Sequence, residues 1–288
     1  MANTDLRSLE AGLDELERPA QRTRRRRTLA ALFPPLVALA LALLIWQLAA
    51  DNNWFGKRDE QLPSPGQTWT AAVDQWEQGR IQAAVLNSLI RGGQGFAAAL
   101  VIGTLLGLLM AKVRFVRAAL GPFVSGLQSL PSVAWVPAGI LWFGLGEAVM
   151  YFVILMGAVP SIANGLLAGI DQIPPLYGRV GRVLGARGLD AMRFVTLPAA
   201  LPGYLAGLKQ GWAFSWRSLM AAELIAQSSS IGLGLGQYLD EGRQFSDIAI
   251  VVSGIAIILA VGVGIELLIF SPIERRVLQR RGLGAVRS

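Results

Sequence analysis

Three charged residues stand in or beside apolar stretches of the sequence, and these residues are the best suited to contact a solute. Arg217 and Glu223 lie within the stretch 203–227, and Arg91 directly precedes the stretch 92–111. Charged side chains are costly inside a bilayer and mark pathways or buried pairs. Glu223 follows Arg217 by six residues, which is about 600° of helical rotation, so the two residues do not form a local pair.

Arg217 could attract an anion, because the planar donor fork of an arginine matches the oxygens of a carboxylate, a nitrate or a sulfonate. The alternative is a structural pair between Arg217 and Glu147, Glu223 or a carbonyl of a neighbouring helix. Arg91 could serve as a gate or a solute ligand, or it could extend its side chain to the membrane interface. Six residues are predicted to line a pathway for a solute: Arg217, Glu223, Trp216, Arg91, Gln128 and Trp135. Packing between helices is the alternative for the two tryptophans.

The composition argues against most forms of catalysis. The 288 residues include no cysteine and no histidine, and only 26 basic and 19 acidic residues. The chain therefore has no thiolate and no disulfide, and it lacks the usual general base and metal ligand. No Gly-x-x-x-x-Gly-Lys-Ser/Thr sequence is present to bind a nucleotide phosphate. We predict a chain without catalytic residues, metal or bound cofactor.

Hydropathy points to a membrane protein. Hydrophobic residues make up 53% of the chain, and the mean hydropathy is +0.49. A helix needs about 20 apolar residues to cross the hydrocarbon core of a bilayer. Six stretches fulfil this condition: residues 29–50, 92–111, 118–143, 148–170, 203–227 and 248–270. The sequence predicts an all-α integral membrane protein with six transmembrane helices, the third made irregular by Pro131 and Pro137.

The lysines and arginines predict the orientation. If the N-terminus is cytoplasmic, the cytoplasmic segments carry 20 of these residues and the outer segments carry four. The positive-inside rule therefore places both termini in the cytoplasm. The net charge of +7 reflects this topology rather than a nucleic-acid surface, since the basic residues flank the spans.

The spans define the organisation of the chain. Residues 1–28 form a cytoplasmic tail, either with an amphipathic surface helix or as a frayed segment with a basic stop. The first span, 29–50, is too long for a typical cleaved signal peptide. Residues 51–91 form an outer segment that leads into the second span, 92–270 form the core with a cytoplasmic loop at 171–202, and 271–288 form a basic cytoplasmic tail.

Glycines predict close helix contacts. Gly203, Gly207 and Gly211 recur every four residues, and Gly103 and Gly107 do so once. Small residues at this spacing let helix backbones approach one another. The run 232–236 has glycine at every second position in an outer loop, where a tight turn is expected.

The cytoplasmic loop 171–202 combines two short helical patterns. The first runs over 176–184 after two prolines, which can begin a helix. Glycines at 185 and 188 interrupt it, and the second runs over 189–196 and ends at Leu197-Pro198. Two short helices joined by a glycine turn would form a rigid projection that suits a partner's groove.

This loop resembles the cytoplasmic signature of the permeases of type I ATP-binding-cassette (ABC) importers. The signature is Glu-Ala-Ala, three residues, Gly, nine residues, Ile, one residue, Leu-Pro. Gly185, Val195, Leu197 and Pro198 have this spacing, whereas Arg179 begins an Arg-Val-Gly sequence in place of Glu-Ala-Ala. The acidic residue that the family offers to the ATPase subunit is therefore basic in this chain.

Further motifs are similar to the sulfonate, taurine, nitrate and bicarbonate branch of that family. They follow one another in order from about residue 62 to residue 270: Leu62-Pro63-Ser64-Pro65, Ser88 with Arg91, Ile140-Leu141-Trp142-Phe143-Gly144, Pro198-Ala199-Ala200-Leu201-Pro202-Gly203, Ala221-Ala222-Glu223 and Gly232-Leu233-Gly234.

The resemblance implies the fold of a type I ABC importer permease and a division of labour among several chains. A permease homodimer in the bacterial cell membrane would bind two ATPase subunits, which hold ATP and magnesium, and a solute-binding protein on the outer side. The residues expected to contact the ATPase are Arg179, Arg182, Leu184, Gly185, Ala186, Arg187, Gly188, Leu189, Asp190 and Pro198.

Three other functions are alternatives to an importer permease for an anion. A permease of the same architecture could carry a non-anionic solute. A stand-alone secondary transporter would normally show an inverted repeat or an intramembrane acidic relay, and neither is evident in the sequence. An intramembrane enzyme would need a cluster of catalytic groups, which the composition does not provide.

Overall fold

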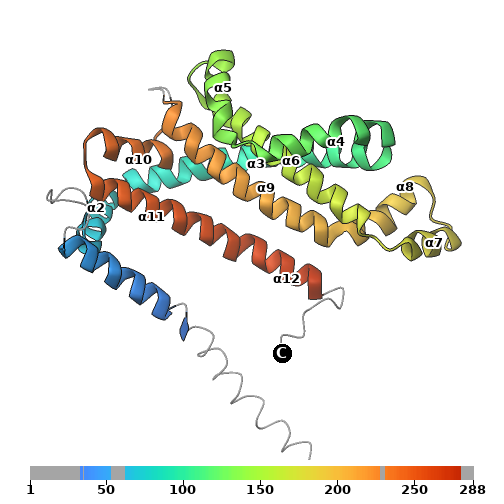
Figure 1. The fold of residues 1–288 in the computed structure, drawn as a ribbon, viewed down its shortest axis with the longest axis horizontal. Helices are drawn as coiled ribbons and strands as arrows, with labels where there is room; N and C mark the ends of the chain where they lie inside the picture. Colours follow the sequence, from blue (N-terminus) through green and yellow to red (C-terminus); the bar gives the residue numbers. More distant parts are fainter. Residues whose placement is uncertain (1–32, 35, 53–61, 228–230, 280–288) are drawn as a thin grey trace, which may run out of the picture. The chain divides into compact units, whose positions relative to one another are not determined.

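A computed structural model of the chain describes residues 33–34, 36–52, 62–227 and 231–279 (Figure 1). The described elements are helices. They belong to two units, Met1–Thr68 and Trp69–Ser288, and each unit is described by itself. The predicted amphipathic helix in residues 1–28 lies outside the described residues.

The described part of the first unit contains an apolar helix, Leu36–Asp51, which covers most of the predicted first span. The indole nitrogen of Trp46 donates a hydrogen bond of 2.9 Å to the carbonyl oxygen of Pro63. This bond ties the end of the helix to the segment that follows it.

The second unit is a bundle of long helices with short helices at its ends (Figure 1). Its elements in chain order are α2 (Pro65–Glu77, which contains the boundary between the units), α3 (Arg80–Lys112), α4 (Arg114–Ser129), the 3₁₀ turn η1 (Ser132–Trp135), α5 (Val136–Phe143), α6 (Glu147–Asp171), α7 (Pro175–Val183), α8 (Gly188–Ala191), the π turn η2 (Met192–Thr196), α9 (Leu197–Ile225), α10 (Leu235–Gln244), α11 (Ile248–Ile265), the π turn η3 (Glu266–Phe270) and α12 (Ser271–Gln279).

Within the described ranges, three helical stretches are long and apolar enough to cross a membrane: Arg80–Lys112, Glu147–Asp171 and Ile248–Gln279. They contain the predicted spans 92–111, 148–170 and 248–270. The predicted span 203–227 lies almost entirely within α9, whose 29 residues reach about 43 Å at 1.5 Å per residue. Helix α3 begins 12 residues before the predicted span, because its polar first turns continue the apolar part without a break.

The prediction of one helix over 118–143 is wrong. Leu130 has an extended backbone with φ −77° and ψ 134°, so α4 ends at Ser129. The residue before a proline is disfavoured in the helical conformation, and Pro131 follows. This part of the chain is therefore two separate helices, α4 and α5, joined by the turn η1.

Helix α6 lies at the centre of the bundle, between α3 and α9 (Figure 1). Glycines allow this close packing, as the spacing predicted. A Cβ added at Gly207 of α9 would lie 2.6 Å from the Cα of Gly165 in α6, and one at Gly203 would lie 2.5 Å from the Cα of Gly169. On the other side, a Cβ at Gly103 of α3 would lie 2.8 Å from the Cβ of Ile162.

Candidate functional site

Two parts of the second unit bear on function, and they lie at opposite ends of α9. Helix α9 begins beside η2 and ends close to α10 (Figure 1). We call these places the α7 end and the α10 end. The α7 end holds the predicted ATPase-coupling residues, and the α10 end holds Arg91 and Glu223.

The α7 end consists of a compact turn between two helices. Pro175 stands at the first position of α7, where a proline costs no hydrogen bond. After α7, Gly185 has φ +86° and Gly188 has φ +54°, and glycine takes up these left-handed conformations without strain. The amide of Ala186 donates to the carbonyl of Gly181 at 2.8 Å, which closes the turn.

The predicted end of the second short helix at Leu197-Pro198 is wrong. Helix α8 continues through η2 into α9, with helical backbone angles at Met192 and at Leu197. The amide of Leu197 donates to the carbonyl of Met192, five residues earlier, so the turn before Pro198 is a π turn. A wider turn accommodates a proline, which has no amide donor and whose ring clashes with the preceding turn of a regular helix.

Apolar side chains at the tip of this turn are exposed. The exposed fractions are 86% for Val183, 79% for Leu184 and 73% for Leu189. Arg179, Arg182, Arg187 and Asp190 are exposed around them. Nine of the ten predicted coupling residues, those from Arg179 to Asp190, thus lie on one projection, while Pro198 lies in the first turn of α9. Val183 is exposed beside them. The amphipathic pattern of α7 could have identified Val183.

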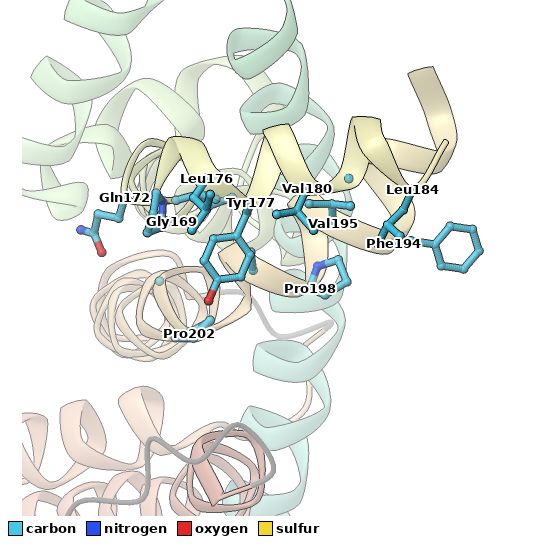
Figure 2. A pocket seen from close by; sticks show the side chains of 15 residues that line it. Gly169, Gln172, Leu176, Tyr177, Val180, Leu184, Phe194, Val195, Pro198 and Pro202 are labelled. Atoms are coloured by element: carbon cyan, nitrogen blue, oxygen red, sulfur yellow. The ribbon is translucent and has the colours of Figure 1, made fainter. Parts of the chain in front are cut away.

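A groove separates α7 from the first turns of α9 (Figure 2). Its volume is about 810 Å³, and Tyr177, Val180, Pro198 and Pro202 are among its mostly apolar lining residues. Figure 2 shows the Tyr177 ring directed toward Pro202 across the groove. The groove closes where Val195 contacts Gly181, since a Cβ on Gly181 would lie 2.9 Å from a Val195 methyl carbon.

The α10 end contains a buried polar cluster centred on Arg91. The Nη1 group donates to the Glu223 carboxylate at 3.1 Å, Nη2 donates to the carbonyl of Gly232 at 2.7 Å, and Nε donates to Glu147 at 3.0 Å. The Arg91 side chain is 4% exposed and that of Glu223 is 0% exposed. Every nitrogen of the buried guanidinium therefore has an acceptor.

Both oxygens of the Glu223 carboxylate also accept hydrogen bonds. The carboxylate accepts from the hydroxyl of Ser88 and from the amide of Gly236 at 3.0 Å. The Ser88 hydroxyl in turn accepts from the amide of Leu235 at 2.8 Å. The glycine run 232–236 lies directly on this cluster: a Cβ on Gly234 would overlap the Glu223 carboxylate, and one on Gly236 would lie 2.5 Å from the carbonyl of Met220. These glycines therefore serve close packing on a buried charge.

Arg217 lies apart from this cluster and is exposed on α9. Its Nε donates to the carbonyl of Ala213 at 3.0 Å, and its guanidinium lies 4.7 Å from the centre of the Phe214 ring. The pairs with Glu147 and Glu223 that the sequence suggested as an alternative are not formed, since both carboxylates bind Arg91.

The remaining predicted pathway residues contact other side chains of the bundle. The Gln128 amide bonds to Ser161 at 3.2 Å and to Asn164 at 2.9 Å. Trp135 packs edge-on against Phe152 of α6, whereas Trp216 stacks on Trp212 of its own helix. Packing between helices, the alternative for the tryptophans, describes the contact of Trp135.

Sequence reasoning missed one ion-pair cluster. Lys209 on α9 binds Glu266 at 2.5 Å and Glu274 at 3.5 Å, so it joins α9 to η3 and α12. In the sequence, Glu266 is the one charged residue of the stretch 248–270. An isolated charge in an apolar span indicates a partner on another helix.

The arrangement is that of a membrane-transport subunit: a bundle of apolar helices packed through glycines, with a projecting helical turn at one end. Residues 99–279 match the family described as binding-protein-dependent transport system inner membrane component. The chain belongs to this family, and it is the permease subunit of a type I ABC importer, as its sequence motifs predicted.

Two relatives place the chain among permeases of the expected branch. The taurine transport system permease protein of Escherichia coli strain K12 is 33% identical over 194 residues, which are 67% of each chain. The nitrate import permease protein of a Synechocystis species is 30% identical over 208 residues, which are 69% of this chain and 74% of the relative.

The fold is shared with a solved structure. A chain of the MetNI methionine ABC transporter in an inward-facing conformation matches with a TM-score of 0.53 and 22% identity, over 67% of this chain and 94% of that one. Family membership implies ATPase and solute-binding partner proteins and a dimeric arrangement. It also overturns the alternative of a stand-alone secondary transporter.

Proposed function

We propose that two copies of this chain form the translocation pathway for a small oxyanion of the sulfonate, taurine, nitrate or bicarbonate type. Each copy binds one ATPase subunit through residues 176–196, and the ATPase subunits hold ATP and magnesium, so the permease itself is not an enzyme. A solute-binding protein delivers the solute on the opposite side of the bacterial cell membrane.

The exposed apolar tip of the α7 end carries this proposal. Val183, Leu184 and Leu189 are each more than 70% exposed, although they lie in a polar, arginine-rich segment too short to span a membrane. Exposed apolar patches rimmed by polar residues are typical of protein interaction sites. The two glycines in left-handed conformations and the bond from Ala186 to Gly181 hold this tip in a fixed shape.

The basic residues support a cytoplasmic α7 end and cytoplasmic termini. Lys112 and Arg114 lie at the junction of α3 and α4, and Arg117 beside them binds Asp171 at the end of α6 that precedes α7. Basic residues flank the cytoplasmic ends of spans. The α10 end has Arg80, Arg91 and Arg243, and each of these binds a carboxylate of the same chain.

One face of α9 suits a polar pathway. Ala206, Gln210, Ala213 and Arg217 share this face and are exposed, and they are small or polar where a lipid-facing helix would present large apolar side chains. In a two-fold dimer, the same face of a second copy would line the other side of the pathway. The guanidinium of Arg217 would attract an oxyanion there, which agrees with the relatives named for taurine and nitrate. A non-anionic solute is the alternative.

Complex assembly with a Leu184→Asp variant tests the proposed ATPase contact. The permease is purified through a tag together with its co-expressed ATPase subunit, and the bound ATPase is quantified. We expect the variant to lose most of the bound ATPase, because an aspartate is costly in an apolar contact. Phe245→Asp, at an exposed phenylalanine next to α10, is the control and should retain it. Full retention by both Leu184→Asp and Leu189→Asp would contradict the proposal.

A further inference from the structure

The α7 end carries four arginines for which the described part of the chain supplies no carboxylate partner. Arg179, Arg182, Arg187 and Arg193 are exposed, and within the part of the chain that the structure describes, none of them forms an ion pair with an acidic residue of this chain. Asp190 is the one acidic residue between positions 175 and 196. The projection is therefore strongly basic.

Several other basic residues of the second unit do have such partners. Arg80 binds Glu241, Arg117 binds Asp171, and Lys209 binds Glu266. This fold therefore places carboxylates beside several of its cations. Within the described residues, these four arginines are gathered on one short projection and form no ion pair with a carboxylate of this chain.

The arginines and the groove lie on different sides of α7. Tyr177, Val180 and Leu184 line the groove beside α9. At 100° per residue, Arg182 points almost opposite to the mean direction of these three side chains, and Arg179 points about 130° away from it. Beyond the turn, the guanidinium of Arg193 lies 5.4 Å from the centre of the Phe194 ring, which leaves its outer side free to bind a partner.

We infer that the ATPase surface that receives the α7 end is acidic, with carboxylates placed around an apolar hollow. This inference rests on the proposed function and specifies the chemistry of its contact. Val183, Leu184 and Leu189 fill the hollow, while Arg179, Arg182 and Arg187 bind the surrounding carboxylates. Arginine is suited to this role, because its donor fork binds a carboxylate through two parallel hydrogen bonds.

The geometry favours a protein partner over lipid headgroups. A helix that lies on a membrane surface turns its apolar face to the lipid and its basic face to water. Part of the apolar face of α7 instead faces the groove and the proline-rich start of α9, and the exposed apolar tip extends from the end of the helix. Four arginines around such a tip match a partner with both apolar and acidic groups.

The salt dependence of the purified permease–ATPase complex tests the inference. The variant combines Arg179→Gln and Arg182→Gln, and the matched control combines Arg275→Gln and Arg276→Gln, two exposed arginines of α12. For the native complex we expect affinity to fall as salt rises from low to high concentration. The variant should bind the ATPase about 3- to 30-fold more weakly at low salt, as expected for two ion pairs, with a flatter salt dependence. The control should behave as the native complex does.

Native affinity and salt dependence in the Arg179/Arg182 variant would overturn the inference. If Leu184→Asp still releases the ATPase in that case, the proposed function stands and only the acidic character of the partner is refuted. The measurement is repeated in nanodiscs with and without anionic lipid. An effect of the variant that appears only with anionic lipid would assign the arginines to headgroups and would also overturn the inference.

Discussion

The guanidinium of Arg91 and the carboxylate of Glu223 form an ion pair at 3.1 Å, and both side chains are sealed within the bundle. The pair joins α3 to α9, two helices whose paired residues are 132 positions apart in the sequence. It also binds the loop before α10 at Gly232 and the first turn of α10 at Gly236. One buried pair thus fixes the geometry of the whole α10 end.

Removing one member of this pair should destabilise the protein severely. In Glu223→Gln, Arg91 would remain buried with one charged acceptor fewer, and such changes typically cost about 3 to 5 kcal/mol. We expect a large drop in the thermal unfolding midpoint of the detergent-solubilised permease. Glu147→Gln is the control, since the Glu147 side chain is 49% exposed and should contribute at most about 1 kcal/mol.

The double change of Arg91→Met and Glu223→Leu separates charge from packing. Since it removes both charges, it should be less destabilising than Glu223→Gln alone. A thermal unfolding midpoint for Glu223→Gln equal to that of Glu147→Gln would refute the conclusion that this pair holds the α10 end together.

The contact between α6 and α9 should tolerate no side chain at Gly207. A Cβ there would lie 2.6 Å from the Cα of Gly165, and a backbone atom cannot move aside without separating the helices. We expect Gly207→Ala to cost about 1 to 3 kcal/mol, as overpacking in a tight core does. The readout is the unfolding midpoint of the purified chain.

Gly264→Ala in α11 is the matched control for that change. A Cβ at Gly264 would meet no atom within 4 Å, and alanine favours a helix over glycine by about 1 kcal/mol. The control should therefore be neutral or slightly stabilising. Equal midpoints for the two variants would show that the close approach of α6 and α9 does not matter for stability.

Much of this fold could be predicted from local patterns. Hydropathy located α3, α6, α9 and α11, because apolar length alone decides whether a helix can cross a bilayer. The glycine repeat of α9 predicted a close contact with another helix, which the structure identifies as α6, and prolines and glycines marked both ends of α7. Each of these signals lies within one short stretch of sequence.

The two wrong predictions of helix ends both concern a proline, because a proline can either end a helix or lie inside one. Pro131 ends α4 by constraining Leu130, whereas Pro198 lies inside a continuous helix because a π turn precedes it. Nothing in the sequence beside either proline distinguishes these cases. The partner of Glu223 was equally inaccessible, since hydropathy does not say which faces of α3 and α9 meet.

The stability of the α10 end should depend on pH through Asp240. Burial alone would raise the pKa of this carboxyl, but hydrogen bonds from Gln244, Arg243 and Gln227 outweigh that effect and hold the pKa below its ordinary value. A carboxyl with a lowered pKa stabilises the folded state at neutral pH, and this contribution is lost as the pH falls through the folded pKa.

Asp240→Asn tests this dependence. The native unfolding midpoint should fall at acidic pH, below about pH 4, and the variant should show a smaller fall from a lower starting value. Asp74→Asn, at an exposed position of α2, should leave the pH profile unchanged. Identical profiles for the native chain and Asp240→Asn would refute the assignment.

The proposed role of Arg217 in the pathway predicts a loss of transport without a loss of stability. The Arg217 side chain is exposed, and its polar contact is with a carbonyl of its own helix. Arg217→Gln should therefore change the free energy of unfolding by no more than about 0.5 kcal/mol, as exposed substitutions do. Removing its charge should reduce uptake of a radiolabelled oxyanion, such as taurine or nitrate, in proteoliposomes that contain the whole importer.

Two comparisons make this result specific. Arg217→Lys keeps the charge and should retain more uptake than Arg217→Gln, although less than the native chain because lysine has no donor fork. ATP hydrolysis without solute should be equal in all three proteins, since α7 is untouched. Native uptake by Arg217→Gln would exclude Arg217 from the pathway, and a parallel loss of bound ATPase would instead show that the residue supports assembly.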